Sequence, residues 1–165
     1  MAKKLNKTQL QELVNSLAWN DGFGCYTRAG FEKMIWPQIA DQAEWIIFFD
    51  IDEMNSLNDK HGQDWVDAMI KKSLSVRAAD YVAAQYKSGD EFVVCLTRDK
   101  GRMPSDPQGL CERLRKTFLE NDIPATFGIA PVTSKDLIEN VKPAYELVRA
   151  EKHANRRGRI NQIGG

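Results

Sequence analysis

The chain has 165 residues, and its 23 lysine and arginine side chains are balanced by 23 aspartates and glutamates. Its length and its 42% of apolar residues are typical of a single globular domain and exclude a wholly disordered chain. The neutral charge balance argues against a protein that coats nucleic acid, so we expect no nucleic-acid partner.

The first part of the chain predicts two helices. Apolar residues recur at helical spacing within residues 6–19, where Thr8 is a candidate N-cap. They do so again within residues 31–39, where Pro37 should bend or end the helix.

The middle of the chain predicts a buried strand and a further helix. Residues 45–49 are almost wholly apolar, which is typical of a strand buried on both faces. This run ends in Asp50-Ile51-Asp52, and helical spacing returns over residues 65–74.

The second half predicts a hairpin followed by alternating helices and strands. Residues 81–87 and 91–96 are β-prone and are separated by Ser88-Gly89-Asp90, which favours a hairpin. The further expected elements are a helix at 106–119, a strand at 125–132 and a helix at 136–152, with Pro143 near its middle or at a break. This order predicts an α/β layer structure around one sheet.

Two acids stand at the ends of predicted strands. Asp50 closes the buried strand and Asp90 lies in the hairpin turn, so their carboxylates converge if the hairpin lies beside the strand. Converging carboxylates repel each other unless a cation lies between them, and Mg²⁺ accepts carboxylates together with phosphate oxygens. The pair suggests a metal-dependent phosphoryl or nucleotidyl transfer centre. The alternative is that Asp90 only supplies turn chemistry.

Five short motifs resemble, in chain order, those of GGDEF domains, the family of the diguanylate cyclases. Residues 88–92 are similar to the signature itself, with Ser88 in place of its first glycine. Residues 50–67 are similar to the family's DxDxFKxINDxxGHxxGD segment. The other matches are residues 24–31 (TGLxNRxxF), residues 126–130 (SxGIA), and Lys152 with Arg156 (AKxxGRN).

The resemblance implies a fold and an activity. The expected class is α/β (α+β), a palm-like cyclase fold whose central, mostly antiparallel sheet of about five strands is flanked by helices. Residues 20–165 would form this domain and residues 1–19 an N-terminal helix. Two protomers would meet as a homodimer, each with one GTP, and join the two nucleotides into cyclic di-GMP with release of pyrophosphate.

The same resemblance implies roles for the acidic residues. Asp50, the carbonyl of Ile51 and Asp90 would hold Mg²⁺, or Mn²⁺ in its place. Asp90 matches the acid that assists deprotonation of the attacking 3′-hydroxyl, and Glu91 would orient the loop and the metal shell.

Further roles concern the bound nucleotide. Asn58 and Asp67 match the pair that reads guanine, which fits their chemistry because a carboxylate accepts from guanine N1–H and its amine. A simpler interpretation of Asn58 is a helix cap. For Lys152 and Arg156, the simpler interpretation is that basic residues in the last turn of a helix complement its dipole. The residues that the resemblance assigns to the phosphates are Glu53, Met54, Lys152 and Arg156.

Several positions depart from the family pattern. Ser88 replaces a glycine, Tyr86 an arginine and Asn55 a lysine that contacts phosphate. Gln63 and Val66 replace a histidine and a glycine beside the guanine pocket. The alternatives are therefore a catalytically inactive domain that binds GTP or cyclic di-GMP as a receptor, or a related cyclase with another cyclic nucleotide as product.

A product-inhibition site is a further candidate. Arg77 and Asp80 resemble the family's RxxD motif, but seven residues separate Asp80 from Ser88, a longer gap than the family has. An RxxD pattern also occurs by chance on a charged helix.

Location is predicted from what the chain lacks. No apolar run approaches the ~20 residues that span a bilayer, so no membrane partner is expected. Three widely spaced cysteines, without CxxC pairing, are typical of reduced thiols in a cytoplasmic protein.

Overall fold

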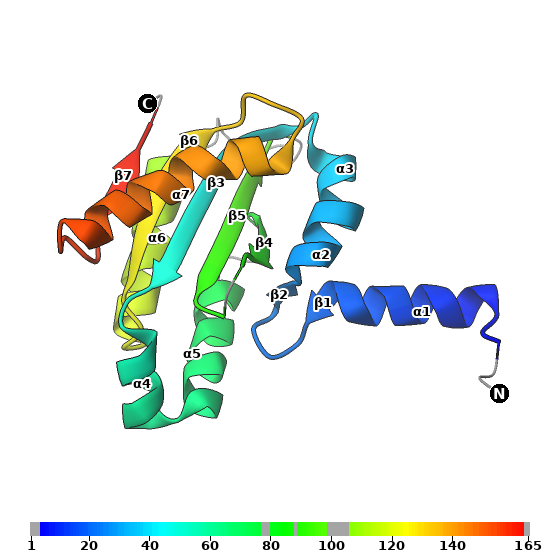
Figure 1. Ribbon diagram of the computed structural model, residues 1–165, viewed down its shortest axis with the longest axis horizontal. Coiled ribbons are helices and arrows are strands. Elements are labelled where there is room, and N and C mark those ends of the chain that lie inside the picture. The colour runs from blue at the N-terminus through cyan, green and yellow to red at the C-terminus, as the bar shows by residue number, and fades with distance from the viewer. Residues whose placement is uncertain (1–3, 77–79, 88, 99–105, 164–165) are drawn as a thin grey trace.

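The computed structural model describes residues 4–76, 80–87, 89–98 and 106–163. In these ranges, one seven-stranded sheet with the strand order β1-β2-β4-β5-β3-β6-β7 is flanked by helices (Figure 1). The α/β class is confirmed. The expected number of about five strands is wrong.

The elements alternate along the chain. The strands are β1 (Trp19–Asn20), β2 (Cys25–Tyr26), β3 (Ala43–Ile51), β4 (Val82–Gln85), β5 (Glu91–Thr97), β6 (Ala125–Pro131) and β7 (Ile160–Gln162). The helices are α1 (Lys7–Ala18), α2 (Arg28–Gly30), a π-helical turn η1 (Phe31–Ile35), α3 (Trp36–Ile39), α4 (Met54–His61), α5 (Gln63–Ser75), α6 (Pro107–Glu120) and α7 (Leu137–His153).

The strand count differs because three strands are very short. β1, β2 and β7 have two or three residues each, too few for an alternating pattern to appear in the sequence. The sheet is mostly antiparallel: among the strands in the described ranges, only the β2–β4 and β6–β7 pairs are parallel.

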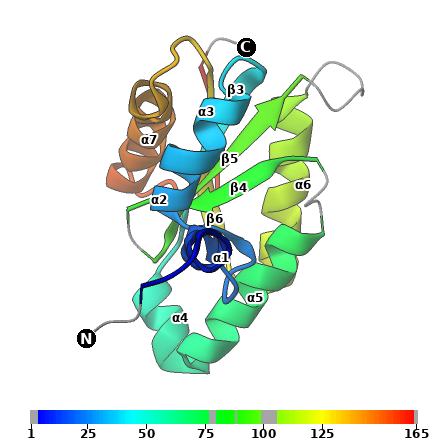
Figure 2. The same ribbon diagram turned by 90° about the vertical axis from the view of Figure 1, so that its right-hand side faces the viewer.

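Strand β3 lies at the centre and is buried on both faces, as its apolar run predicted. It pairs with β5 on one side and with β6 on the other. Ile47 and Phe49 pack into the core with α5 and α6, whereas Ile46 and Phe48 pack into the core with α7. Figure 2 shows these layers, with α2, α3 and α7 on one side of the sheet and α5 and α6 on the other. All four side chains are fully buried.

Two helical details correct the sequence predictions, and a third decides between the two alternatives for Pro143. Helix α1 is capped by Asn6, whose side chain accepts from the backbone of Gln9, so Thr8 is not the cap. The expected helix at 31–39 contains a π-turn, in which the N–H of Trp36 bonds to the carbonyl of Phe31 just before a proline. Helix α7 continues through Pro143 without a break.

The segment after β3 folds into two helices instead of one. Gly62, with a φ of 85°, separates α4 from α5 in a backbone conformation that other residues rarely adopt. The sequence pattern predicted α5 but not α4, whose apolar residues are few. The two helices stand together at the lower end of the sheet in Figure 1.

The cysteines are free and buried, as expected for reduced thiols. Burial raises the pKa of the Cys25 thiol to about 12, so this group does not act as a thiolate near neutral pH. In the described ranges, no helix combines the length and the apolar character needed to cross a bilayer.

Candidate functional site

The hairpin lies directly beside the buried strand, so the predicted acids come together. Asp50 on β3 is the register partner of Glu91 on β5. The N–H of Ile51 donates to the carbonyl of Asp90 at 2.9 Å. The sheet therefore fixes the end of β3 against the turn that carries Asp90.

A lysine from the last turn of α7 completes this cluster. Nζ of Lys152 lies 3.1 Å from Oδ1 of Asp50 and 3.4 Å from Oδ1 of Asp52. It also donates to the carbonyl oxygen of Ile51 at 3.4 Å. The sequence assigned this lysine to phosphates, but only the fold brings α7 back across the end of β3.

The surroundings make Asp50 an unusual acid. Burial raises its pKa to about 6; the ammonium of Lys152 opposes this rise, and the nearby charges of Asp90 and Glu91 add to it. Asp90 and Glu91 thus lie near enough to Asp50 for their charges to oppose its ionisation.

Asp52 is a site residue that the sequence analysis missed. It is buried, and it accepts a 2.7 Å hydrogen bond from Oγ1 of Thr126, which in turn accepts from the N–H of Gly158. Asp52 thus connects β3, β6 and the loop after α7. The second acid of the Asp50-Ile51-Asp52 run was the only signal in the sequence.

The residues predicted to hold a metal carry the oxygen donors that a hard divalent cation prefers. Asp50, the Ile51 carbonyl and Asp90 supply oxygen donors, and the ammonium of Lys152 already lies at two of these groups as a cation. Within the described ranges, no three His, Cys, Asp or Glu side chains group into a metal site. A metal bound there would need further oxygen ligands, which Mg²⁺ takes from water and phosphate.

A cavity of about 260 Å³ adjoins these acids, between α4, α5 and the hairpin. It brings together Asn58 on α4 and Asp67 on α5, each with a buried Oδ1 that has no hydrogen-bond partner in the part of the chain that is described. Burial, followed by the charge of Asp64, raises the pKa of Asp67. The full lining is Phe23, Met54, Asn55, Asn58, Gln63, Asp67, Gly89 and Asp90.

The side chains of this cavity could form hydrogen bonds with a planar heterocycle that carries N–H groups. Unpartnered buried oxygens are costly, and a ligand with N–H groups would satisfy them. Asn58 does not cap a helix, because it lies inside α4, so that simpler interpretation is wrong.

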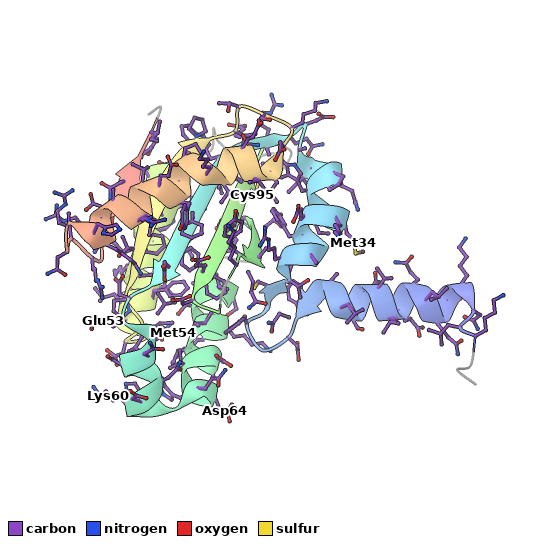
Figure 3. The ribbon with its side chains drawn as sticks, in the orientation of Figure 1. Met34, Glu53, Met54, Lys60, Asp64 and Cys95 are labelled. Carbon is purple, nitrogen blue, oxygen red and sulfur yellow. The ribbon has the colours of Figure 1, made fainter. Side chains whose placement is uncertain are left out.

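The turn from β3 into α4 suits an anion. Glu53 adopts a left-handed conformation with a φ of 54°, and its side chain makes no capping hydrogen bond to the start of α4 at Met54. The N–H groups of a helix start attract negative charge when they lack a cap. Figure 3 shows Glu53 and Met54 at this junction, while Lys60 and Asp64 lie at the opposite end of the α4–α5 pair.

The structure does not bring Arg156 to the acids. Its guanidinium forms two hydrogen bonds with the carboxylate of Glu151, at 3.0 and 3.1 Å. The neighbouring Arg157 instead reaches the turn from β3 into α4, with Nη1 3.4 Å from Oε1 of Glu53. A run of basic residues in the sequence could not distinguish the two.

Tyr86, which replaces a family arginine, lies in an aromatic cluster. Its ring packs edge-on against Phe48, with ring centroids 5.6 Å apart, and the guanidinium of Arg28 lies 5.1 Å from its centroid. A second cavity, of about 270 Å³, opens on this side of the sheet between Asp50, Glu91 and α7.

The product-inhibition candidate is only partly visible. Arg77 lies outside the described residues, as does Ser88 of the signature, and Asp80 is half-buried. The RxxD pair therefore stays a prediction.

Solved structures with the same architecture are GGDEF domains. The coiled coil and GGDEF domain of DgcB from Caulobacter crescentus, in complex with c-di-GMP, matches with a TM-score of 0.72 and 16% identity, covering 95% of this chain and 91% of that one. The GGDEF domain of FimX from Pseudomonas aeruginosa matches with 0.68 and 17%, covering 88% and 99%.

A third structure comes from an enzyme complex. Diguanylate cyclase SiaD from Pseudomonas aeruginosa, with its activator SiaC, matches with a TM-score of 0.70 and 14% identity, covering 94% of this chain and 66% of that one. No protein-family model and no curated protein sequence matches the chain. The chain has the fold of a GGDEF domain, and identities this low show the fold alone.

Proposed function

We propose that the chain is a diguanylate cyclase, which condenses two GTP molecules into cyclic di-GMP and releases two pyrophosphates. The observation that carries this proposal is the cavity beside the acid cluster. Asn58 and Asp67 present buried, unpartnered oxygens there, and Gly89 and Asp90 of the hairpin form its border. A base held in this cavity would place its ribose and phosphates toward Asp50.

Guanine suits the cavity better than adenine. The Asp67 carboxylate would accept from N1–H and the exocyclic amine, and the Asn58 amide would serve the acceptor edge of the purine. Adenine lacks this donor pair, so it would leave the oxygen of Asp67 unsatisfied.

The chemistry would take place at the end of β3. The 3′-oxygen of one GTP attacks the α-phosphorus of the other, its proton passes to Asp90, and the bond to the departing pyrophosphate breaks. Repeating the step in the opposite direction closes the ring. Mg²⁺ or Mn²⁺, held by Asp50, the Ile51 carbonyl and Asp90, would lower the pKa of the hydroxyl and neutralise phosphate charge.

Other residues would bind and orient the phosphates. The uncapped N–H groups at Met54 and the left-handed turn at Glu53 would surround them, and Lys152 would supply a point charge. Arg156 would have to leave Glu151 to reach them, so its role depends on a rearrangement.

The product requires two nucleotides, and each chain offers one cavity with base-reading groups among its described residues. We therefore propose a homodimer whose sites face each other. The ligand and activator seen with DgcB and SiaD make product binding and a protein regulator reasonable for this chain as well. A cytoplasmic location is part of the proposal, because GTP and free buried thiols fit that compartment.

The test is an incubation of the purified protein with GTP and Mg²⁺, followed by chromatography and mass spectrometry of the products. We expect cyclic di-GMP from the wild type and none from Asp90→Asn. Asp122→Asn is a matched control, because Asp122 is exposed and in a left-handed turn that asparagine tolerates. Failure of the wild type to form any cyclic dinucleotide at any protein concentration would refute the proposal.

A receptor without turnover is the second candidate. It is favoured by Asn55, which lines the base cavity where the family has a phosphate-binding lysine, and by the engagement of Arg156 with Glu151. Binding of GTP or cyclic di-GMP in calorimetry, with no product in the incubation, would support it. Gln63 in the same cavity motivates adding ATP to the incubation, since a mixed product would identify a related cyclase.

A further inference from the structure

The ammonium of Lys152 lies where the proposed metal ligands converge. Its contacts with Oδ1 of Asp50 and with the Ile51 carbonyl, at 3.1 and 3.4 Å, involve two of the three proposed ligand groups. The lysine and Asp50 side chains are only 21% and 19% exposed, so this is not a loose surface pair. A divalent ion and the ammonium compete for the same oxygens.

Asp52 gives Lys152 a second partner that is not a proposed metal ligand. Its Oδ1 lies 3.4 Å from Nζ, and its side chain is 6% exposed. Thr126 holds this carboxylate from β6 at 2.7 Å. If Lys152 leaves Asp50, it can therefore keep Asp52 as an anionic partner.

We propose that Lys152 is the internal counter-cation of the metal site, which occupies the cation position in the nucleotide-free protein and yields it to the divalent ion. The inference rests on the proposed function, because it takes the acids as the metal site. Two cations a few ångströms apart repel strongly in a poorly solvated site, so the metal alone binds weakly. A triphosphate offers Lys152 a new partner, so nucleotide and metal strengthen each other's binding.

The alternative is a purely structural ion pair. In that case, removing the lysine charge would destabilise the fold but would leave the affinity for a divalent ion unchanged. The two roles therefore differ in metal binding by the nucleotide-free protein.

The experiment is a titration of the nucleotide-free full chain with Mn²⁺, followed by the electron paramagnetic resonance signal of the free ion. We expect Lys152→Gln to bind Mn²⁺ about tenfold more tightly than the wild type, because a nearby positive charge is gone. Lys142→Gln is the matched control, since Lys142 is exposed on the same helix. It should bind Mn²⁺ like the wild type, and Lys152→Arg, which keeps the charge, should bind weakly.

A second measurement uses the wild type alone and does not depend on how well the variant folds. The side-chain resonances of ¹³C-labelled lysines are followed during a titration with Mg²⁺. We expect the Lys152 signal to move with the same apparent affinity as metal binding, while the Lys142 signal stays in place.

Three outcomes would overturn the inference. They are equal Mn²⁺ affinity of the wild type and Lys152→Gln, a Lys152 signal that does not respond to Mg²⁺, and no detectable binding of either ion. Its failure is separable from that of the proposed function. Tight Mn²⁺ binding by Lys152→Gln in a protein that ignores GTP refutes only the cyclase, whereas cyclic di-GMP synthesis with unchanged Mn²⁺ affinity refutes only the counter-cation.

Discussion

At the scale of single residues, the ionisation of Asp50 opposes folding in the metal-free chain. Its pKa is about 6 in the folded protein, against an ordinary value of 3.8. Between these values the folded chain holds a proton that the unfolded chain has released, so stability falls as the pH rises from about 4 to about 6. Above about pH 6 the contribution of Asp50 to the free energy of unfolding no longer changes with pH.

Asp50→Asn should therefore stabilise the fold at neutral pH. A difference of about two pKa units corresponds to ~3 kcal/mol, and because solvent screens part of the carboxyl, we expect a gain of about 1 kcal/mol. The measurement is urea unfolding of both proteins in EDTA, from pH 3.5 to pH 8. The gain should be absent at the acidic end and constant above pH 6.5. A variant less stable than the wild type at pH 8 would show that the Lys152 pair outweighs burial.

Thr126 stabilises the fold through two hydrogen bonds, one of them to Asp52. Its hydroxyl is fully buried, donates to Asp52 and accepts from the N–H of Gly158. Thr126→Val keeps the shape but leaves both groups short of a partner, so the free energy of unfolding should fall by about 2 kcal/mol. Thr117→Val, at an exposed helical hydroxyl, should change it by less than ~0.5 kcal/mol in the same denaturation series. Equal effects would refute the assigned role of the buried bonds.

At the scale of elements, α7 reaches the site because it packs very closely on β6. A methyl group built at Gly128 would overlap the backbone carbonyl of Ala144, so any side chain there pushes the helix away from the sheet. The same helix delivers Lys152 to the acids. The position of the lysine therefore depends on a glycine in the neighbouring strand.

Gly128→Ala should destabilise the fold by about 1–3 kcal/mol, the range of overpacked cores. Gly89→Ala serves as the comparison, because nothing lies within 4 Å of a Cβ built there. Thermal unfolding followed by circular dichroism distinguishes the two. A melting temperature for Gly128→Ala as high as that for Gly89→Ala would mean that α7 can shift without cost.

Which elements the sequence could predict depended on their length and on local pattern. The apolar run at 45–49 and the periodic stretch at 136–152 each specify their structure locally, and both predictions are confirmed. The two-residue strands β1 and β2 are defined by pairing, β1 with β2 and β2 with β4, so no local pattern marks them. The π-turn at 31–35 directly precedes the helix that contains Pro37, and the pattern showed only that this proline would disturb the helix.

The sequence predicted those residues of the candidate site that stand at strand ends, but not those that depend on distant partners. Asp50 and Asp90 were found because both stand at strand ends, and pairing of adjacent strands brings such ends together. Asp52 and Arg157 were missed because their partners, Thr126 and Glu53, lie far along the chain. Only tertiary packing determines such contacts.

At the scale of the whole molecule, helix α1 extends away from the sheet (Figure 1). Leu10, Leu13, Val14 and Leu17 are 42–66% exposed although they follow helical spacing. Such a stripe on an isolated helix is typical of a seam between two helices. A second copy of the chain is the partner that the proposed reaction requires.

The double variant Leu13→Glu/Leu17→Glu should therefore be monomeric and should lose cyclic di-GMP synthesis while still binding GTP. Two charged residues in an apolar seam repel their copies in the partner helix, whereas the base cavity lies on α4 and α5 and is untouched. Sedimentation equilibrium reports the dimer, calorimetry the binding and chromatography the product. Leu119→Glu, at an exposed leucine of α6, is the matched control and should behave like the wild type. If the double variant is monomeric and still makes cyclic di-GMP at the wild-type rate, α1 does not form the contact needed for synthesis. The two sites would then have to meet through another surface.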